Sequence, residues 1–371
     1  MVTKAFAVIG ANYGDEGKGL VTNYLCHKAK NKNNRVLNIL TNGGCQRGHT
    51  IIDSHNNRII CSHLGSGFEY ADVMFSKFYL VNPMVFRKEY DEWCKLHNNV
   101  NKIFIDELCT ISTPYDMYIN RIVENRRNKK HSSCGYGIWE TIHRNEHFSI
   151  IWLELRNLTD RALRSHLKYV RDIYYSMILH EYNITLTKEE KNIFYSDILL
   201  DNFINDIRFM QDKVVITDNS IYNIYDTLIF ENAQGLLLDK DLHDWCTPTK
   251  TGMTYIDELL YDTNIEVTLY YVTRSYLTKH GNGDFPGECD QNEINSNIID
   301  LTNKPNQYQG SLRFGLFNEV RAEELYNRIK LDATNHKFKI VVTHMNEYNS
   351  EYLNKYADFY SYNEQDIVSN K

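Results

Sequence analysis

The glycine-rich turn "GANYGDEGKG" (residues 10–19) combines Asp15, Glu16 and Lys18 with a backbone suited to binding phosphate. Backbone N–H groups of a glycine turn at the start of a helix form an anion site, and a lysine adds positive charge. A carboxylate in such a turn is repelled by phosphate unless it holds Mg²⁺ or takes a proton from a substrate. The turn therefore predicts phosphate binding combined with metal or acid–base chemistry, although Gly19 replaces the usual Ser or Thr of a phosphate loop.

A second glycine-rich turn, "NGGCQRGHT" (residues 42–50), holds an arginine, a histidine and a threonine within four positions. It follows an apolar, strand-like run from Val36 to Leu40, so it lies where a strand ends. A histidine such as His49 is a frequent general acid, but a single loop histidine is also ordinary. Its role therefore depends on whether the two turns border one site.

Strand-like runs separated by helical stretches must position these turns. They are "AFAVIG", "RVLNIL", "KIFIDE", "DTLIFENAQG", "NIEVTLYYVTRS" and "KFKIVVTH". This alternation predicts an α/β fold with a large, mostly parallel sheet, helices on both faces and a P-loop-like turn. We expect one domain over residues 1–371 with a helical insertion at about 150–220. Ligands of such sheets bind beyond the carboxyl ends of the strands.

Composition limits the class of protein. The chain has 371 residues, a hydrophobic content of 42% and a formal net charge of −7, which argues against a nucleic-acid partner. No apolar run is long enough to span a bilayer, so we expect no membrane association. The eight cysteines lack CxxC spacing and indicate neither a disulfide framework nor a cysteine zinc site. We expect a reduced, cytoplasmic protein, in the host cell cytoplasm if a phage encodes it.

Four motifs follow one another in the order found in adenylosuccinate synthetases: "GDEGKG", "NGG" with "RGHT", "FENAQGLLLD" and "TRSYLTKHGNGDFPGE". The chain resembles this family over residues 10–288. The resemblance implies a homodimeric ligase that forms a C–N bond. A nucleoside triphosphate phosphorylates the C6 oxygen of a purine nucleotide, and the amine of L-aspartate then displaces that phosphate.

The resemblance also implies roles for three catalytic residues. Asp15 matches the base that removes the purine N1 proton, His49 matches the general acid, and Gln234 matches the glutamine that holds the purine near N1 and O6. One or two Mg²⁺ ions per subunit are implied, bound between Asp15 and the main-chain carbonyl of Gly48.

Binding residues follow from the same resemblance. The nucleoside triphosphate is expected to contact Gly14, Glu16, Gly17, Lys18, Gly19, Gly48, His49, Thr50, Asn346 and Ser361. The purine monophosphate is expected to contact Asn12, Asp15, Gln46, Ser133, Cys134, Gly135, Arg144, Gln234 and Thr247. Arg144 is the candidate for the arginine that the dimer partner supplies. Aspartate is expected to contact Gly310, Ser311 and Arg313.

Departures from the family pattern bear on the phosphate donor. The family's last strand ends in Thr-Lys-Leu-Asp, and its Asp accepts hydrogen bonds from the guanine of GTP. Here "VVTHMNEYN" places His344 for the Lys and Asn346 for the Asp. An amide offers one acceptor and one donor, which suits adenine. The sequence therefore favours ATP or dATP over GTP.

Other departures bear on the purine substrate. In "QGSLRFG", Ser311 replaces an arginine that in the family lies near the ribose 2′-OH, so a deoxyribose is favoured. The chain ends soon after Asn346, and we expect Ser361 in this shortened region to cover the base. These changes resemble a phage branch of the family that converts dGMP to N6-succino-2-amino-2′-deoxyadenylate for 2-aminoadenine DNA. Some members of that branch replace the loop aspartate with serine, whereas Asp15 is retained here.

Two alternatives remain open at this point. One is an ordinary adenylosuccinate synthetase that uses IMP and GTP. The other is a catalytically inactive nucleotide sensor built on the same fold, although retained Asp15, Lys18, His49 and Gln234 argue against it, because a pure binder needs no general acid.

Overall fold

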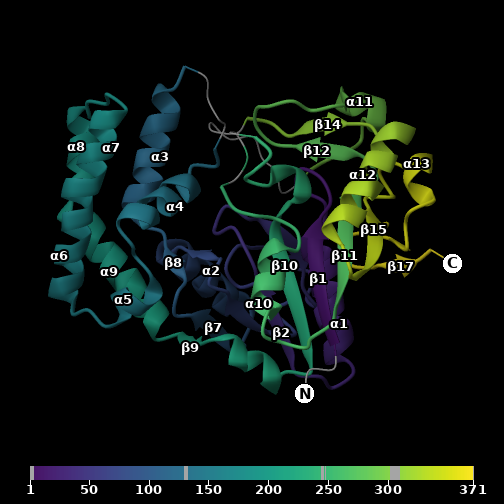
Figure 1. Cartoon of the computed structure of the whole chain (residues 1–371), viewed down its shortest axis with the longest axis horizontal. Helices are drawn as coiled ribbons and strands as arrows, with labels where there is room; N and C mark the ends of the chain where they lie inside the picture. Colours follow the sequence, from purple (N-terminus) through teal and green to yellow (C-terminus); the bar gives the residue numbers. More distant parts are fainter. Residues whose placement is uncertain (1–3, 129–132, 244–245, 247, 301–309, 371) are drawn as a thin grey trace.

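A ten-stranded sheet forms the centre of the protein (Figure 1). The computed structural model describes residues 4–128, 133–243, 246, 248–300 and 310–370. The strand order is β17-β16-β15-β11-β1-β10-β2-β5-β7-β9, and neighbouring strands are parallel except β16 and β17. The strands are β1 (Lys4–Gly10), β2 (Val36–Leu40), β5 (Asp72–Phe75), β7 (Ile103–Asp106), β9 (Val214–Thr217), β10 (Thr227–Gly235), β11 (Val267–Arg274), β15 (Lys337–Thr343), β16 (Phe359–Tyr360) and β17 (Val368–Ser369).

The predicted α/β fold with a mostly parallel sheet is confirmed. The six predicted runs form β1, β2, β7, β10, β11 and β15. The central strand β10 is buried at every position, as expected for a parallel strand covered on both faces. Strands β5, β9, β16 and β17 were not predicted, because each is four residues or shorter and shows too little of a strand period.

Helices cover both faces of the sheet, as predicted. Val8 of β1 packs with residues of α1 (Lys18–Lys30), whereas its neighbours on β1 pack on the opposite face with α10 (Thr254–Leu260) and α12 (Glu319–Asp332). Successive strand side chains point to opposite faces, so one strand contributes to two cores.

A block of helices lies at one end of the sheet, on the left of Figure 1. It contains α2 (Pro83–Leu96), α3 (Pro114–Arg126), α4 (Ile138–His147), α5 (Trp152–Arg156), α6 (Asp160–Val170), a π-helical turn (Arg171–Tyr175), α7 (Ser176–Glu181), α8 (Lys188–Phe194) and α9 (Asp197–Gln211). The helices expected at 150–220 end at Gln211, because β9 follows and returns the chain to the main sheet beside β7.

Arg144 lies in the interior of this block. Its side chain is fully buried, and its Nε and Nη2 lie 2.9 and 3.1 Å from the carboxylate oxygens of Asp116 at the start of α3. Its Nη2 also donates to the Ile111 carbonyl at 2.7 Å. In this chain the charge of Arg144 is already paired with Asp116, and its contact with the purine monophosphate of a partner subunit stays a prediction. The homodimer itself stays a prediction.

Smaller elements complete the fold. The hairpin of β3 (His49–Ile52) and β4 (Arg58–Cys61) follows the second glycine turn, and β6 (Leu80–Val81) pairs with β8 (Thr110–Ile111). A three-stranded sheet is made of β12 (Leu277–Lys279), β14 (Arg313–Gly315) and β13 (Glu288–Cys289). The remaining short helices are 3₁₀ turns at Asn219–Ile224 and Leu236–Leu238, α11 (Gln291–Ile294) and α13 (Glu351–Asn354).

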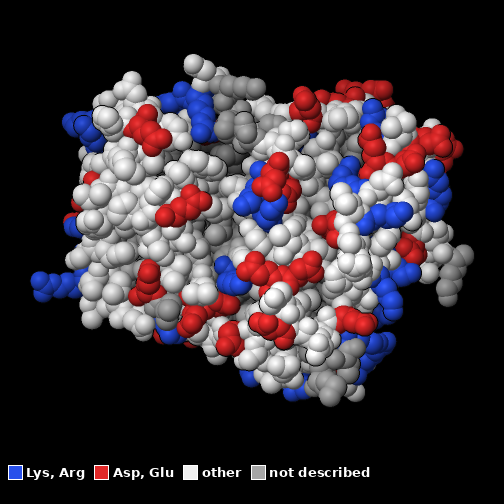
Figure 2. Space-filling view, viewed as in Figure 1, with Lys and Arg blue, Asp and Glu red and all other residues white. Residues whose placement is uncertain are grey.

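The surface carries charges of both signs. On the face shown in Figure 2, acidic and basic side chains are interspersed among the described residues. Such mixing differs from the continuous basic surface expected of a nucleic-acid-binding protein. Among the helices that the structure describes, none is long and apolar enough to cross a membrane.

Candidate active site

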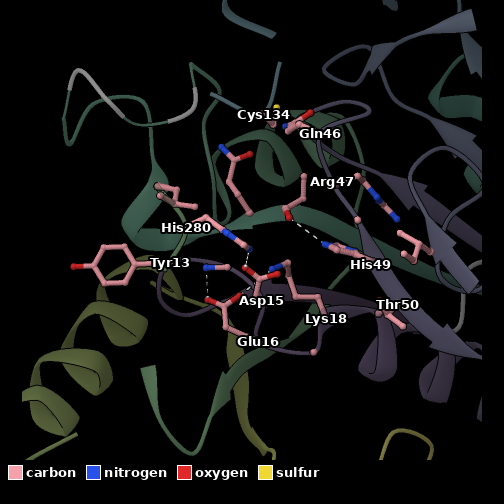
Figure 3. Close-up of a pocket in the computed structure, with 18 of the residues that line it drawn as sticks. Tyr13, Asp15, Glu16, Lys18, Gln46, Arg47, His49, Thr50, Cys134 and His280 are labelled. Atoms are coloured by element: carbon pink, nitrogen blue, oxygen red, sulfur yellow. Dashed lines mark hydrogen bonds and ion pairs between the residues drawn. The ribbon is translucent and has the colours of Figure 1, made fainter. Parts of the chain in front are cut away.

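One large pocket, with a volume of about 1050 Å³, lies at the carboxyl edge of the sheet. The turns that follow β1, β10 and β15 line it, together with β3 and α4, as expected for an open parallel sheet. It brings together these residues singled out in the sequence: Gly14, Asp15, Glu16, Gly17, Lys18, Gly19, Gln46, Gly48, His49, Thr50, Ser133, Cys134, Gln234 and Asn346. The two glycine turns therefore border one cavity, and Figure 3 shows residues that line it in close-up.

Other residues singled out in the sequence do not line this pocket. Besides the buried Arg144, they are Asn12, Gly135, Gly310, Ser311, Arg313 and Ser361. Thr247, which was also expected to contact the purine nucleotide, lies outside the described residues.

The first turn is built to hold an anion and here holds its own carboxylate. Glu16 Oε1 accepts hydrogen bonds from the backbone N–H of Asn12 at 2.8 Å and of Gly14 at 3.1 Å. Its Oε2 lies 2.9 Å from Lys18 Nζ, and both side chains are buried. Left-handed Gly17 (φ 90°) precedes α1, which begins at Lys18. A bound phosphate would compete with Glu16 for these amides and for the lysine.

Asp15 presents its carboxylate to the cavity from a strained position. Its φ of 57° is left-handed, which is uncommon for a residue other than glycine. The backbone carbonyl of Asp15 accepts a hydrogen bond from Arg274 Nε, which holds this conformation. Its Oδ2 lies 3.3 Å from Nε2 of His280, and both side chains are about one-fifth exposed. Sequence reasoning missed Arg274 and His280, although the motif "TRSYLTKHGNGDFPGE" contains both, because only the fold brings this distant segment beside Asp15.

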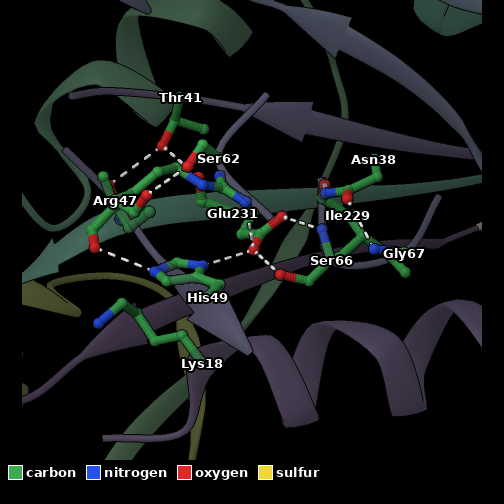
Figure 4. Close-up of polar contacts among 12 residues, drawn as sticks. Lys18, Asn38, Thr41, Arg47, His49, Ser62, Ser66, Gly67, Ile229 and Glu231 are labelled. Carbon is green, nitrogen blue, oxygen red and sulfur yellow. Dashed lines mark hydrogen bonds and ion pairs between the residues drawn. The ribbon is translucent and has the colours of Figure 1, made fainter. Parts of the chain in front are cut away.

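A buried carboxylate on β10 organises the second turn (Figure 4). Glu231 Oε1 lies 2.9 Å from Arg47 Nη2 and 2.6 Å from His49 Nδ1, and Ser66 donates to the same carboxylate through its N–H and hydroxyl. Burial alone would raise the pKa of Glu231, but the Arg47 guanidinium and these hydrogen bonds outweigh it and hold that pKa well below its usual range. Sequence reasoning missed Glu231, although the "FENAQG" motif contains it.

Glu231 also influences which ring nitrogen of His49 carries the proton. Burial and the nearby Arg47 charge lower the pKa of His49. The hydrogen bond to Glu231 acts in the opposite direction but is outweighed. In the neutral ring, an Nδ1–H that donates to Glu231 leaves Nε2 without a proton, 3.0 Å from the Ala233 carbonyl oxygen. A proton that arrives at Nε2 is stabilised by this carbonyl. The ring is therefore arranged to gain and release a proton at Nε2, beside the pocket.

The side chains of Gln234 and Gln46 belong to the wall of the cavity. Gln234 Nε2 donates to Thr249, at 2.7 Å to Oγ1 and 3.3 Å to the carbonyl oxygen, and this fixes the orientation of the amide. The Oε1 atoms of Gln234 and Gln46 are buried and have no hydrogen-bond partner among the described residues. A buried acceptor without a partner is costly, so both favour a ligand that donates hydrogen bonds.

Ser133 lies beside an unexpected buried acid. Its hydroxyl donates to Asn120 Oδ1 at 2.9 Å, and Asn120 Nδ2 donates to Glu140 Oε1 at 3.0 Å. Burial raises the pKa of Glu140 to about 7. The sequence offered no signal for Glu140, because its effect depends on the burial of one face of α4.

The residues expected to bind aspartate lie apart from the pocket. Gly310 and Ser311 are exposed, and the Arg313 guanidinium contacts Glu288 at 2.7 and 2.6 Å and the carbonyls of Gly281 and Gly283 at 2.9 Å. Their role in binding aspartate stays a prediction.

The remaining predicted residues have structural contacts. Ser361 is buried and its hydroxyl donates to the Asn363 carbonyl. Asn12 Nδ2 donates to Thr273 Oγ1 at 2.9 Å, and the Gly135 carbonyl accepts from Arg121 Nε at 3.0 Å.

The protein has an open, mostly parallel sheet, with a glycine turn and a charged pocket at the carboxyl edge. It therefore belongs to the class of α/β proteins that bind ligands beyond the carboxyl ends of their strands. The family model for adenylosuccinate synthetase matches residues 7–314, and the chain belongs to this family. The resemblance inferred from the sequence is therefore confirmed at the level of the family.

Bacterial relatives are similar over most of this chain. The adenylosuccinate synthetase of Nostoc sp. is 28% identical over 302 residues, which cover 76% of this chain and 62% of the relative. That of Trichodesmium erythraeum is 27% identical over 315 residues, which cover 79% of this chain and 65% of the relative. The chain thus spans less than two-thirds of the length of these relatives.

Two solved structures share the fold. The fully ligated adenylosuccinate synthetase of Plasmodium falciparum matches with a TM-score of 0.64 at 21% identity. The match covers 93% of this chain and 77% of that structure's chain. The succinoaminodeoxyadenylate synthetase of cyanophage S-2L matches with a TM-score of 0.65 at 13% identity. The match covers 100% of this chain and 96% of that structure's chain. At these identities the similarity concerns the fold.

The Glu231 network predicts a large loss of stability in Glu231→Gln. This change leaves the fully buried Arg47 guanidinium without its counter-charge. We expect the free energy of unfolding in urea at pH 7 to fall by about 3–5 kcal/mol. Ser66→Ala is the control, because it keeps the ion pair and loses only a hydrogen bond, at about 0.5–1.5 kcal/mol. Equal losses in the two variants would contradict this account.

Glu140 predicts a specific pH dependence of stability. Its pKa of about 7 in the folded protein exceeds the value of about 4.3 expected after unfolding, so the folded state binds one more proton between these pH values. Stability due to this group therefore falls as pH rises from about 4 to 7, by at most about 3 kcal/mol. The free energy of unfolding of Glu140→Gln, measured in urea, should therefore rise relative to that of the wild type as pH goes from 5 to 8. Parallel stability curves would disprove it.

Proposed function

We propose that this protein is a ligase that joins L-aspartate to dGMP with ATP or dATP as the phosphate donor. The products are N6-succino-2-amino-2′-deoxyadenylate, the nucleoside diphosphate and phosphate, and they supply 2-aminoadenine for phage DNA. Membership of the adenylosuccinate synthetase family supports the ligase reaction. The choice of nucleotides is the finer part of the proposal and rests on the pocket.

Asn346 is the single observation that carries the choice of phosphate donor. It lines the pocket just beyond the end of β15, and Thr343 at that strand end donates from Oγ1 to the Glu16 carbonyl at 2.8 Å. The base-reading segment and the phosphate turn are therefore neighbours, as one nucleoside triphosphate requires. An amide can pair with the N6 amine and N1 of adenine, whereas guanine presents two adjacent donors on that edge.

The cyanophage structure is compatible with this choice. That enzyme was solved with dGMP and with dATP as energy donor, and its fold matches over 96% of its own chain. The preference for a deoxyribose has less support from the pocket, because Ser311 is exposed and lies apart from it. That preference rests on the resemblance to the phage branch.

Within the proposed reaction, Asp15 removes the N1 proton while the C6 oxygen attacks the γ-phosphorus of the triphosphate. His49 stands on the opposite turn and, once it carries a proton on Nε2, stabilises charge on the transferred phosphoryl group by donating a hydrogen bond. The aspartate amine then attacks C6 and the phosphate leaves. Glu231 acts as a positioning residue that holds His49 at 2.6 Å.

The pocket fits the Mg²⁺ that the family implies. The partly exposed Asp15 carboxylate and the exposed backbone of Gly48 line the same cavity, and hard oxygen ligands of this kind suit Mg²⁺. When bound, the ion neutralises phosphate charge. Lys18 and the amides of the first turn would hold the same phosphates.

One alternative has its own support. The bacterial relatives named above are adenylosuccinate synthetases, which favours the ordinary reaction with IMP and GTP. The same fold accommodates both reactions, so a direct comparison of substrates is needed.

A crossed turnover assay tests the proposal. With L-aspartate and Mg²⁺ present, dGMP or IMP is combined with ATP or GTP, and phosphate release and product mass are measured. We expect the highest kcat/KM for dGMP with ATP. Asp15→Asn and His49→Asn serve as controls and should lose about 10²–10⁴-fold in turnover while still binding ATP. Preference for IMP with GTP would return the protein to the ordinary reaction.

Asn346→Asp should shift the choice of phosphate donor. Adenine N1 is an acceptor, so a carboxylate oxygen in place of the amide donor would repel it. Guanine has two donors on this edge and would gain two acceptor oxygens. We expect the ratio of ATP to GTP affinity, from isothermal titration, to fall by roughly 5–150-fold. Asn363→Asp places the same charge elsewhere on the pocket wall and is the matched control. Wild-type protein that prefers GTP would refute adenine recognition, as would equal shifts in both variants.

A further inference from the structure

We propose that Asp53, His55 and His97 form a binding site for a divalent transition cation of the Zn²⁺ type. Asp53 and His55 lie in the turn between β3 and β4, and His97 follows the last residue of α2. One potential ligand atom from each residue lies within 4.8 Å of the others. None of the three lines the nucleotide pocket, so this site is separate from the proposed Mg²⁺ site.

Asp53 is held in a fixed orientation. Its Oδ1 accepts hydrogen bonds from the backbone N–H of His55 at 2.8 Å and of Asn57 at 2.7 Å. Its Oδ2 accepts from Asn57 Nδ2 at 2.9 Å. The side chain is buried, and these bonds fix the direction of its oxygens as a metal ligand requires.

His97 carries the inference furthest. Its ring stacks on Trp93, with centroids 3.9 Å apart, and its side chain is only 7% exposed. Its Nδ1 lies 3.3 Å from the Trp93 carbonyl, which places a proton on Nδ1 and leaves the lone pair of the neutral ring on Nε2. Histidines that bind metals usually donate their other ring N–H in this way.

The contact between His97 and Asp53 has the dimensions of a metal site. Nε2 lies 3.0 Å from Asp53 Oδ2, but it forms no hydrogen bond of acceptable geometry among the described residues. Two ligand atoms that each lie about 2.1 Å from a tetrahedral Zn²⁺ are about 3.4 Å apart. A cation between the two atoms therefore satisfies both lone pairs with little movement.

His55 completes the set and indicates the kind of cation. Its ring is exposed on the turn, with its centroid 5.9 Å from that of His97, so rotation of its side chain can bring a nitrogen to the same ion. Two imidazoles and one carboxylate suit Zn²⁺ and its neighbours in the first transition series, whereas Mg²⁺ and Ca²⁺ prefer oxygen ligands. The bound ion would join α2 to the hairpin that begins at His49.

Metal titration of the wild-type protein tests the site without any assay of activity. Metal-free protein is titrated with Zn²⁺ by calorimetry and with Co²⁺ by visible absorption. We expect one ion per chain, tetrahedral Co²⁺ bands without a thiolate charge-transfer band, and a higher unfolding temperature with Zn²⁺. A thiolate band would assign the ion to cysteine and overturn the proposal, as would the absence of stoichiometric binding.

Variants then assign the ligands. His55→Gln changes an exposed residue, so it should fold normally and weaken Zn²⁺ binding by about tenfold or more, and His97→Gln should do the same. His143→Gln is the matched control, because His143, Glu146 and His147 form another potential cation group on α4. Unchanged affinity in His55→Gln, or loss of binding in His143→Gln, would overturn the assignment. These readouts are independent of the proposed ligase reaction.

Discussion

The buried carboxylate of Glu231 is the interaction on which the candidate site depends. It stands on β10, the strand between β1 and β2, and one of its oxygens contacts both Arg47 and His49. Removing a carboxylate and a guanidinium from water is expensive, and the cost is offset only when their geometry and hydrogen bonds are complete. Ser66 supplies two further donors to the carboxylate, whereas Nε and Nη1 of Arg47 have no hydrogen-bond partner among the described residues. The second glycine turn therefore takes its shape from the centre of the sheet.

The first turn is attached to the same sheet from the other side. Thr343 at the end of β15 and Arg274 at the end of β11 both bind its backbone, so three neighbouring strands determine where Asp15 and Lys18 lie. Glu16 occupies the amides and the lysine that suit a phosphate. Binding of a triphosphate would thus exchange one anion for another in a turn that is already formed, which limits the reorganisation that binding requires.

Family membership and the departures from the family pattern concern different parts of this structure. The retained motifs lie on the turns around the pocket, where a parallel sheet places its ligands. Among the changed positions, Asn346 lies on the pocket wall, whereas Ser311 and Arg313 lie away from it, with Arg313 bound to Glu288. The pocket therefore bears more directly on the proposed phosphate donor than on the sugar of the proposed purine substrate.

The sequence by itself determined the parallel sheet, its long strands and the two glycine turns, because these depend on local apolar runs and on the backbone freedom of glycine. It also brought Asp15, Lys18, His49 and Gln234 into one predicted site through the order of the motifs. Only the tertiary structure decided that Arg144 is an interior ion-pair partner of Asp116, that Glu231 holds His49, and that His280 faces Asp15. Each of these three findings depends on burial or on contact between residues far apart in the chain, and a local sequence pattern encodes neither burial nor such contacts.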